Sequence, residues 1–358
     1  MTHQSTQRLW VVGPLPPPIN GQSLYTAAIV GRFSEAFVIR QHRIAGSVVD
    51  KLLSCLKAAL DVLKNGRSGE VAYTTPPGQL GIVPFLLVIL AMRWKGFNIL
   101  IHHHTFRPVY KAPLRSMRLL VFLAGARQTH ILLSRNMAAL FRKFYGTGRD
   151  LRVIAVSNAW LSPPARPADV SPCARAITLG HMSVLTREKG VLQVLDIHRA
   201  LLRRGIEAGL IIAGPVKDEE LRQEIAAYCE HEPSATYLGP VSGDAKARFF
   251  ASITDFVLPS SLVDEAEPLV MYETMSLGVN FYATPVGCIP EILPERYLLT
   301  ADQESNAERI IRNRADQVDT HADSPTSLHE AAYSISVGQL SELIGSIIRL
   351  AASPGGGE

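Results

Sequence analysis

The alternation of short apolar runs with amphipathic stretches most constrains how this chain can fold. Strands that alternate with helices predict a parallel sheet covered by helices on both faces. We therefore expect the first half to form a doubly wound α/β unit. Its expected strands are 9–13, 37–41, 70–74, 98–102, 129–134 and 152–157, and its expected helices are 21–33, 48–64, 79–94, 113–124 and 135–145.

The same alternation restarts after a proline-rich segment at 162–172, which has no apolar period and is typical of a linker. A chain of 358 residues suits two domains of ordinary size. We expect Rossmann-like domains at 1–161 and 173–335, and a final helix with a disordered tail at 336–358. Strands of the second domain are expected at 176–179, 210–213, 236–238, 255–258, 279–283 and 297–299, and helices at 190–204, 218–230, 243–252, 268–277 and 288–293.

The charge is distributed unevenly between the two halves. Residues 1–160 carry 20 Lys and Arg and 5 Asp and Glu, whereas residues 161–358 carry 16 Lys and Arg and 27 Asp and Glu. The net charge of the whole chain is +4. A half this basic predicts an anionic partner such as a membrane surface, a nucleic acid or an acidic substrate. Aromatic residues make up 7% of the chain and no nucleic-acid-binding module is recognisable, so we expect no nucleic-acid partner.

Cysteine usage and hydropathy indicate a cytoplasmic protein. The four cysteines have no Cys-x-x-Cys spacing, which favours free thiols. The N-terminal residues have no charged-then-apolar signal segment. The longest apolar run, 80–92, contains Pro84 and is shorter than the ~20 residues that cross a bilayer. We expect a buried helix there.

The segment 259–294 carries the clearest chemistry. Pro268 is suited to start a helix, and the free N–H groups of its first turn, from Leu269 and Val270 onward, form an anion site. Glu265 lies just before this turn, and Glu273 lies about 1.5 turns inside the helix. Carboxylates accept hydrogen bonds from vicinal hydroxyls. A phosphate flanked by hydroxyls describes a nucleotide-sugar.

This segment resembles the donor site of the retaining glycosyltransferases of family 4, also called group 1, which have the GT-B architecture. The resemblance rests on two Glu separated by seven residues and on the following Gly287-x-x-Pro-Glu291. It implies two Rossmann-like domains facing across a cleft, with the last helix packing back on the first domain. Further matching segments lie at 13–23, 101–105, 179–190, 210–215 and 237–241.

The resemblance implies roles for individual residues. Glu273 would hold the ribose, and Glu265 the donor sugar. Lys189 would stabilise the charge that grows on the leaving diphosphate. The family uses Lys and Arg together here, but His181 stands at the usual Arg position, and Arg187 is the alternative second cation.

Four further positions match the family's pattern. Gly21 would let the backbone approach the diphosphate, and Gly214 belongs to the loops expected to read the base. Glu291 would lie near the nucleotide. In the sequence HHH at 102–104, His104 best matches a histidine that lines the cleft near donor sugar and acceptor, and no further ligands are spaced for a zinc site.

Two basic segments of the first half suggest an anionic membrane. One is an amphipathic helix that carries Lys51, Lys57 and Lys64 among leucines, a pattern typical of helices that lie on membranes. An ordinary solvated surface helix is the alternative. The other segment, broken by Pro113, contributes Arg107, Lys111, Arg115 and Arg118.

The resemblance therefore implies a retaining, metal-independent glycosyltransferase that needs no cofactor and uses a UDP- or GDP-linked sugar. We expect a lipid-linked glycan of exopolysaccharide or cell-envelope synthesis as acceptor. The enzyme would be cytoplasmic and peripheral on the inner face of the membrane. A nucleotide-sugar 2-epimerase or hydrolase of the same architecture is the alternative.

Overall fold

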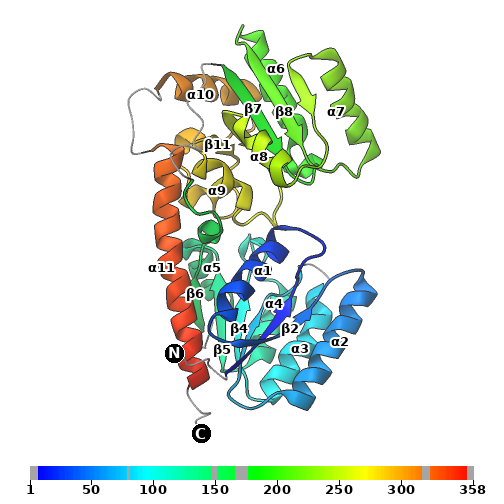
Figure 1. The fold of residues 1–358 in the computed structure, drawn as a ribbon, viewed down its shortest axis with the longest axis vertical. Helices are drawn as coiled ribbons and strands as arrows, with labels where there is room; N and C mark the ends of the chain where they lie inside the picture. Colours follow the sequence, from blue (N-terminus) through cyan, green and yellow to red (C-terminus); the bar gives the residue numbers. More distant parts are fainter. Residues whose placement is uncertain are drawn as a thin grey trace. The chain divides into compact units, whose positions relative to one another are not determined.

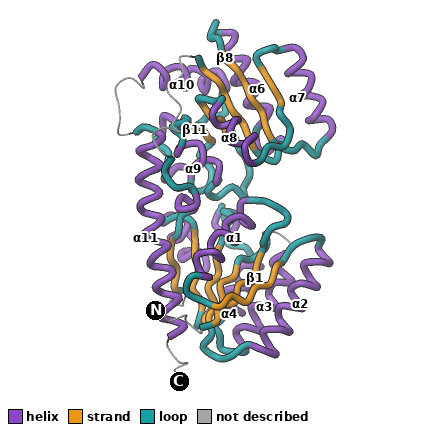
Figure 2. The backbone as a smooth tube through the Cα atoms, viewed as in Figure 1, coloured by secondary structure: helices purple, strands orange, loops and turns teal. Residues whose placement is uncertain are grey.

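The computed structural model describes residues 7–78, 81–146, 148, 151–165, 176–316 and 323–352. Most of the expected linker, 166–172, and the tail from residue 353 lie outside the described residues. The contacts divide the chain into a first unit, Met1–Leu161 with Ile335–Glu358, and a second unit, Ser162–Ser334. Each unit contains one parallel sheet (Figures 1 and 2).

The sheet of the first unit has six parallel strands in the order β2-β1-β3-β4-β5-β6. Its expected strands are all present, and most bounds differ by only a few residues. The strands are β1 (Arg8–Gly13), β2 (Val38–Arg43), β3 (Val71–Thr74), β4 (Asn98–His102), β5 (Gln128–Leu132) and β6 (Arg152–Ala155). The helices are α1 (Gly21–Ser34), α2 (Val48–Asn65), α3 (Ile82–Trp94), α4 (Arg115–Ala124), α5 (Arg135–Tyr145) and part of α11 (Pro325–Ala352).

Alternation along β1 assigns the two faces of this sheet. Leu9 and Val11 are fully buried in a core cluster that also contains Tyr25 of α1 and Leu343 of α11. Trp10 points to the opposite face, toward α2. Both faces of a parallel sheet must be covered because its strands are apolar on both sides.

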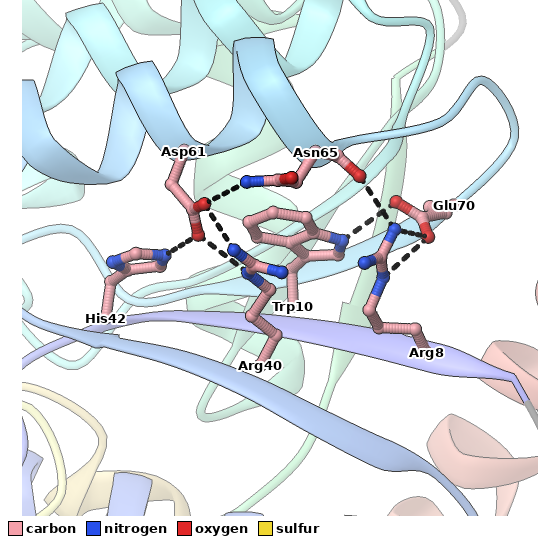
Figure 3. A network of polar contacts seen from close by, with 7 residues as sticks. All are labelled: Arg8, Trp10, Arg40, His42, Asp61, Asn65 and Glu70. Carbon is pink, nitrogen blue, oxygen red and sulfur yellow. Dashed lines mark hydrogen bonds and ion pairs between the residues drawn. The ribbon is translucent and has the colours of Figure 1, made fainter.

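A polar network joins α2 to the sheet beneath it (Figure 3). Asp61 of α2 is ion-paired with Arg40 and lies 2.8 Å from His42 Nε2, both on β2. The indole of Trp10 donates to Glu70 Oε2 at 2.8 Å. Burial alone would raise the pKa of Asp61, but hydrogen bonds from Arg40, Asn65 and His42 lower it to about 2. The network consists of Arg8, Trp10, Arg40, His42, Asp61, Asn65 and Glu70.

The C-terminal helix α11 begins at Pro325, well before the final helix that was expected within 336–358. Ser324 accepts from the backbone N–H of Ser327 at 3.2 Å, and Pro325 occupies the first helical position. Both residues favour a helix start here. By length and composition α11 could cross a membrane. Because Leu340, Leu343 and Ile347 are buried in the core of the first unit, we interpret it as a core helix.

The sheet of the second unit has five parallel strands in the order β11-β10-β7-β8-β9. The fold class expected from the sequence, two doubly wound α/β units, is confirmed. The strands are β7 (Ile177–Met182), β8 (Ala208–Ala213), β9 (Ala235–Tyr237), β10 (Asp255–Leu258) and β11 (Asn280–Ala283). The helices are α6 (Val191–Arg203), α7 (Glu219–His231), α8 (Gly243–Ala251), α9 (Leu269–Ser276) and α10 (Gln303–Asp316).

Several local expectations were wrong. Helix α10 was not expected, because its sequence is polar and shows only a weak apolar stripe. The segment expected as strand 297–299 contains the end of a 3-10 turn, η7 (Glu295–Tyr297), and a single bridge from Leu298 to Ala283. The expected helix 288–293 is only a 3-10 turn, η6 (Ile289–Glu291). Helix α3 is buried on one face only.

The network around Asp61 generates a stability prediction. Asp61→Ala leaves the cations on β2 without their carboxylate, so we expect the free energy of unfolding to fall by about 2 kcal/mol. Ser54→Ala, on the same helix, should change it by less than about 0.5 kcal/mol. Urea denaturation followed by circular dichroism measures both, and equal midpoints for the two variants would contradict an anchoring role.

Candidate functional site

An ion pair between Lys189 and Glu265 forms the centre of the candidate site. Lys189 ends the 3-10 turn η5 (Arg187–Lys189), which follows β7, and Glu265 lies in the loop between β10 and α9. Lys189 Nζ donates to Glu265 Oε2 at 2.5 Å, and Ser260 Oγ donates to the same oxygen at 3.2 Å. The side chains are 23% and 9% exposed. A lysine and a carboxylate therefore meet beyond the carboxyl ends of β7 and β10.

Two glycines fix the positions of these loops. Gly190 has a φ of 83°, and a Cβ there would lie 2.3 Å from the carbonyl oxygen of Pro259. Gly287 has a φ of 61°, and a Cβ there would lie 2.3 Å from the carbonyl oxygen of Glu265. Only glycine suits both the left-handed backbone and this close approach. The turn at Gly287 therefore supports the backbone of Glu265 directly.

The second expected carboxylate, Glu273, lies on α9 and pairs with Lys246 of α8. Lys246 Nζ donates to Glu273 Oε1 at 2.6 Å, and both side chains are about one third exposed. Lys246 was not predicted, because only the folded arrangement of α8 and α9 brings the two residues together. Sequence reasoning also missed Ser260, although its place directly after a strand end is a usable signal.

Helix α9 begins at Leu269, one residue later than the sequence predicted. Pro268 is its N-cap and makes no side-chain hydrogen bond to the helix. Leu269 and Val270 therefore lie in a first turn that has no side-chain cap. Met271 and Tyr272 are buried, and the Tyr272 hydroxyl donates to Glu267 at 2.5 Å. The buried side chains of α9 thus fix the helix against the core of the second unit.

The two candidates for a second cation are both engaged elsewhere. Arg187 is exposed and ion-paired with Glu220, at 3.3 Å, and with Glu224. His181 is buried, and its Nδ1–H donates to the carbonyl of Val257 at 2.8 Å. Burial, with a smaller contribution from Lys189, lowers the pKa of His181 to about 4, against the opposing effect of the hydrogen bond that His181 donates to the carbonyl of Val257. His181 is therefore neutral at neutral pH and supplies no positive charge.

The loops expected to contact the base lie close together. The N–H of Gly214 donates to the carbonyl of Gly239 at 2.8 Å, and a Cβ on Gly214 would lie 1.8 Å from the carbonyl oxygen of Ser183. A surface cavity of about 420 Å³ adjoins the second loop; Leu238, Pro240, Val241 and Arg248 contribute to its lining. Glu291 is exposed on η6, and Cys288 is buried as expected.

His104 and Gly21 lie in the first unit. His104 packs against Tyr25, with ring centres 4.6 Å apart, and its Nε2 is buried without a hydrogen-bond partner. Burial, aided by His103, lowers the pKa of His104 to about 3. Gly21 begins α1, where the side chain of Asn20 caps the helix by accepting from the N–H of Ser23 at 2.9 Å. Asn20 is therefore the residue that starts α1, since Asn is a favoured N-cap.

The basic residues of the first half lie largely at the surface. Lys57 and Lys64 are exposed on α2, and Lys51 is half-buried. Only Arg115 and Arg118 of the second segment are α-helical, because Pro113 precedes α4, and both are exposed. Arg107 begins the 3-10 turn η2 (Arg107–Val109), and Lys111 lies over the ring of Tyr110. Among the described residues no group of three His, Cys, Asp or Glu is placed to hold a metal ion.

Residues 175–316 match the family model for glycosyl transferases of group 1. The second unit is therefore similar to the glycosyl transferases of group 1. The match covers the Lys189–Glu265 pair, α9 and the turn at Gly287, which are the parts of the site described above. No curated protein sequence matches the chain.

Solved structures extend the likeness to the whole chain. HepE from Anabaena in complex with UDP-glucose is 16% identical, with a TM-score of 0.67 over 97% of this chain and 100% of that chain. Sucrose-phosphate synthase from Thermosynechococcus elongatus is 16% identical, with a TM-score of 0.70 over the same shares. The catalytic domain of starch synthase IV from Arabidopsis thaliana, bound to ADP and acarbose, is 10% identical, with a TM-score of 0.67 over 98% and 100%. The chain therefore has the GT-B fold.

The close approach at Gly287 generates a binding prediction. Gly287→Ala should displace the backbone of Glu265 and lower the affinity for a nucleoside diphosphate at least tenfold, about 1.4 kcal/mol. Gly205→Ala is the matched control, since Gly205 has a φ of 73° but open space around it. Isothermal titration calorimetry separates them. Equal affinities in the two variants would show that the turn does not position the site.

Buried His181 generates a pH prediction. Its pKa of about 4 in the folded chain lies below the ordinary 6.5, so the unfolded chain binds the extra proton. Its contribution to stability is complete above about pH 6.5 and is lost as the pH falls toward 4. His181→Asn should flatten the fall of the melting temperature over this range. An unchanged slope in calorimetric scans would assign the pH dependence to other groups.

Proposed function

We propose that the chain is a retaining glycosyltransferase that moves a sugar from a nucleoside diphosphate to an acceptor, which is a lipid-linked glycan intermediate. The observation that carries this proposal is the pairing of Lys189 with Glu265 inside the domain that matches the group 1 family. Solved structures of the same fold include complexes with UDP, with UDP-glucose and with ADP.

Lys189 and Glu265 supply the two kinds of contact that the donor needs at its reacting centre. An ammonium group has three N–H donors, so Lys189 can bind a phosphate oxygen while it keeps one bond to Glu265. Glu265 accepts hydrogen bonds, which suits the hydroxyls of the donor sugar. As the bond between C1 and the phosphate oxygen breaks, Lys189 would stabilise the charge on the leaving diphosphate.

Glu273 would bind the ribose. It lies on α9 beyond the first turn, which suits a nucleoside whose diphosphate is bound at that turn. Its present partner, Lys246, uses one carboxylate oxygen, and ribose hydroxyls are suitable donors to the same group. The first turn of α9, at Leu269 and Val270, would receive the phosphates with its N–H groups. We assign the donor to this surface of the second unit.

The acceptor would bind the first unit, and its polar end would meet His104. This histidine is neutral and has an unpartnered buried Nε2, so it can form a hydrogen bond with a hydroxyl without changing its charge. In the proposed step, the acceptor oxygen attacks C1 from the face that the diphosphate leaves. The acceptor proton passes to the departing phosphate oxygen, so no protein base is required.

Transfer assays with purified protein test the role of Lys189. Lys189→Ala should lower kcat by about 100-fold or more, because the leaving charge loses its cation. Arg203→Ala is the control, since it removes another ion-paired cation, at the far end of α6. Unchanged turnover in Lys189→Ala would overturn the assignment.

Glu273→Ala tests the ribose contact separately. We expect nucleoside diphosphate binding to weaken by about 2 kcal/mol, roughly thirtyfold in Kd, and transfer to be abolished. A thermal-shift screen of nucleoside diphosphates identifies the base first, because a ligand that binds the folded state raises the melting temperature. Nuclear magnetic resonance of the product gives the anomeric configuration. An isomerised or hydrolysed sugar formed without acceptor would identify an epimerase or a hydrolase instead.

A further inference from the structure

Helix α2 has its large apolar side chains on the outside. Its buried positions are occupied by Cys55, Ala58, Ala59 and Val62, which are small or medium in size. Surface helices of soluble proteins normally place their larger apolar residues inward. Here the outward face, with exposures from 40% to 65%, consists of Val48, Val49, Leu52, Leu53, Leu56 and Leu60.

Two polar side chains of α2 also face the sheet. Asp61 and Asn65 are hydrogen-bonded to each other at 2.7 Å, and Asp61 is ion-paired with Arg40 below the helix (Figure 3). This network fixes the rotation of α2, because turning the leucines inward would break the ion pair. The outward leucines are therefore a stable property of the fold.

Helix α3 continues the apolar surface. It contacts α2 and α4, and it lies beside α2 in Figure 1. The helix is apolar on all sides, which is typical of a buried or membrane-contacting helix. However, Val83, Leu87, Leu90 and Trp94 are exposed, and their spacing of 4, 3 and 4 places them on one face. Trp94 has the largest exposed fraction of the four, 76%.

Helix α4 adds Leu119 and Phe122, with Arg115 and Arg118 in the preceding turn. We call the outward apolar residues of α2, α3 and α4 the three-helix face. Of the 21 large apolar side chains exposed in the described part of the chain, 12 belong to this face. Concentration of this kind marks an interaction surface, since isolated exposed apolar residues are normal.

The charges around the three-helix face are mostly positive. The segment from 71 to 149 contains no Asp or Glu and eleven Lys or Arg. The acidic residues of α2 are Asp50, which caps the helix start, and Asp61, which is paired inward. Exposed Lys57 and Lys64 lie on the same helix as the leucines. The surface thus combines apolar area with positive charge.

We propose that the three-helix face docks on an anionic membrane, with its apolar side chains inserted at the boundary between headgroups and acyl chains. This combination is characteristic of helices that lie in the membrane interface, where tryptophan is also favoured. A second copy of the chain is a poorer occupant, because it would bring the same basic side chains together. The docking proposal stands independently of the transfer reaction.

Vesicle cosedimentation tests the docking directly. We expect the full chain to bind vesicles of phosphatidylcholine mixed with phosphatidylglycerol more strongly than phosphatidylcholine alone, and binding to weaken at high salt. Leu53→Glu with Leu60→Glu should lower the partition coefficient by about tenfold or more. The control replaces two equally exposed residues outside the face, Val38→Glu with Ile335→Glu. Circular dichroism confirms that both variants are folded.

Trp94 reports on insertion within the same experiment. The chain has three tryptophans, and Trp10 and Trp160 are buried, so Trp94 is the exposed one. Its fluorescence should shift to shorter wavelength on vesicle binding and be quenched by brominated lipids. The shift and the lipid quenching should disappear in Trp94→Phe.

Three results would overturn the proposal. One is equal vesicle binding by the leucine variant and its control. Another is vesicle binding without a change at Trp94. The third is a concentration-dependent dimer, seen by light scattering, that the leucine substitutions dissociate while vesicles leave the wild type in solution. A loss of docking with normal transfer to a soluble acceptor would separate this proposal from the proposed function.

Discussion

Both sheets are parallel, and the need to cover two apolar faces of each determines much of what the remaining residues can do. In the first unit, α1 and α11 cover one face with large side chains such as Tyr25 and Leu343. The other face is covered by α2, α3 and α4. Because α2 meets this demand with small residues and a polar network, its large residues are left for another contact.

In the second unit, the parallel order brings the loops after β7 and β10 to one edge of the sheet. These strands are neighbours, so the lysine after one reaches the glutamate after the other. The glycines 190 and 287 permit the loops to approach closely enough for the contact. The candidate site thus follows from strand order together with two positions that have no side chain.

Strand and helix positions were predictable because periodicity is a local signal, and Glu265, Pro268 and Glu273 could be selected because their spacing is local too. Lys246 could not be predicted, since its contact depends on how α8 packs beside α9. His181 was considered as a candidate cation because its position in the sequence does not show whether its side chain is buried. The sequence indicated that α2 is an amphipathic helix of a kind that lies on membranes, but an ordinary surface helix stayed open, because an amphipathic pattern does not say which face meets the sheet.

The pairing of each candidate carboxylate with a lysine has a consequence for selectivity. The positive charge of Lys189 is balanced by Glu265, and that of Lys246 by Glu273. Inorganic phosphate would have to compete with a carboxylate and would leave that carboxylate unsatisfied. A compound that carries hydroxyl groups as well as phosphates can donate hydrogen bonds to the carboxylate whose lysine it takes over. In the proposed donor site, these pairs would therefore select against simple anions.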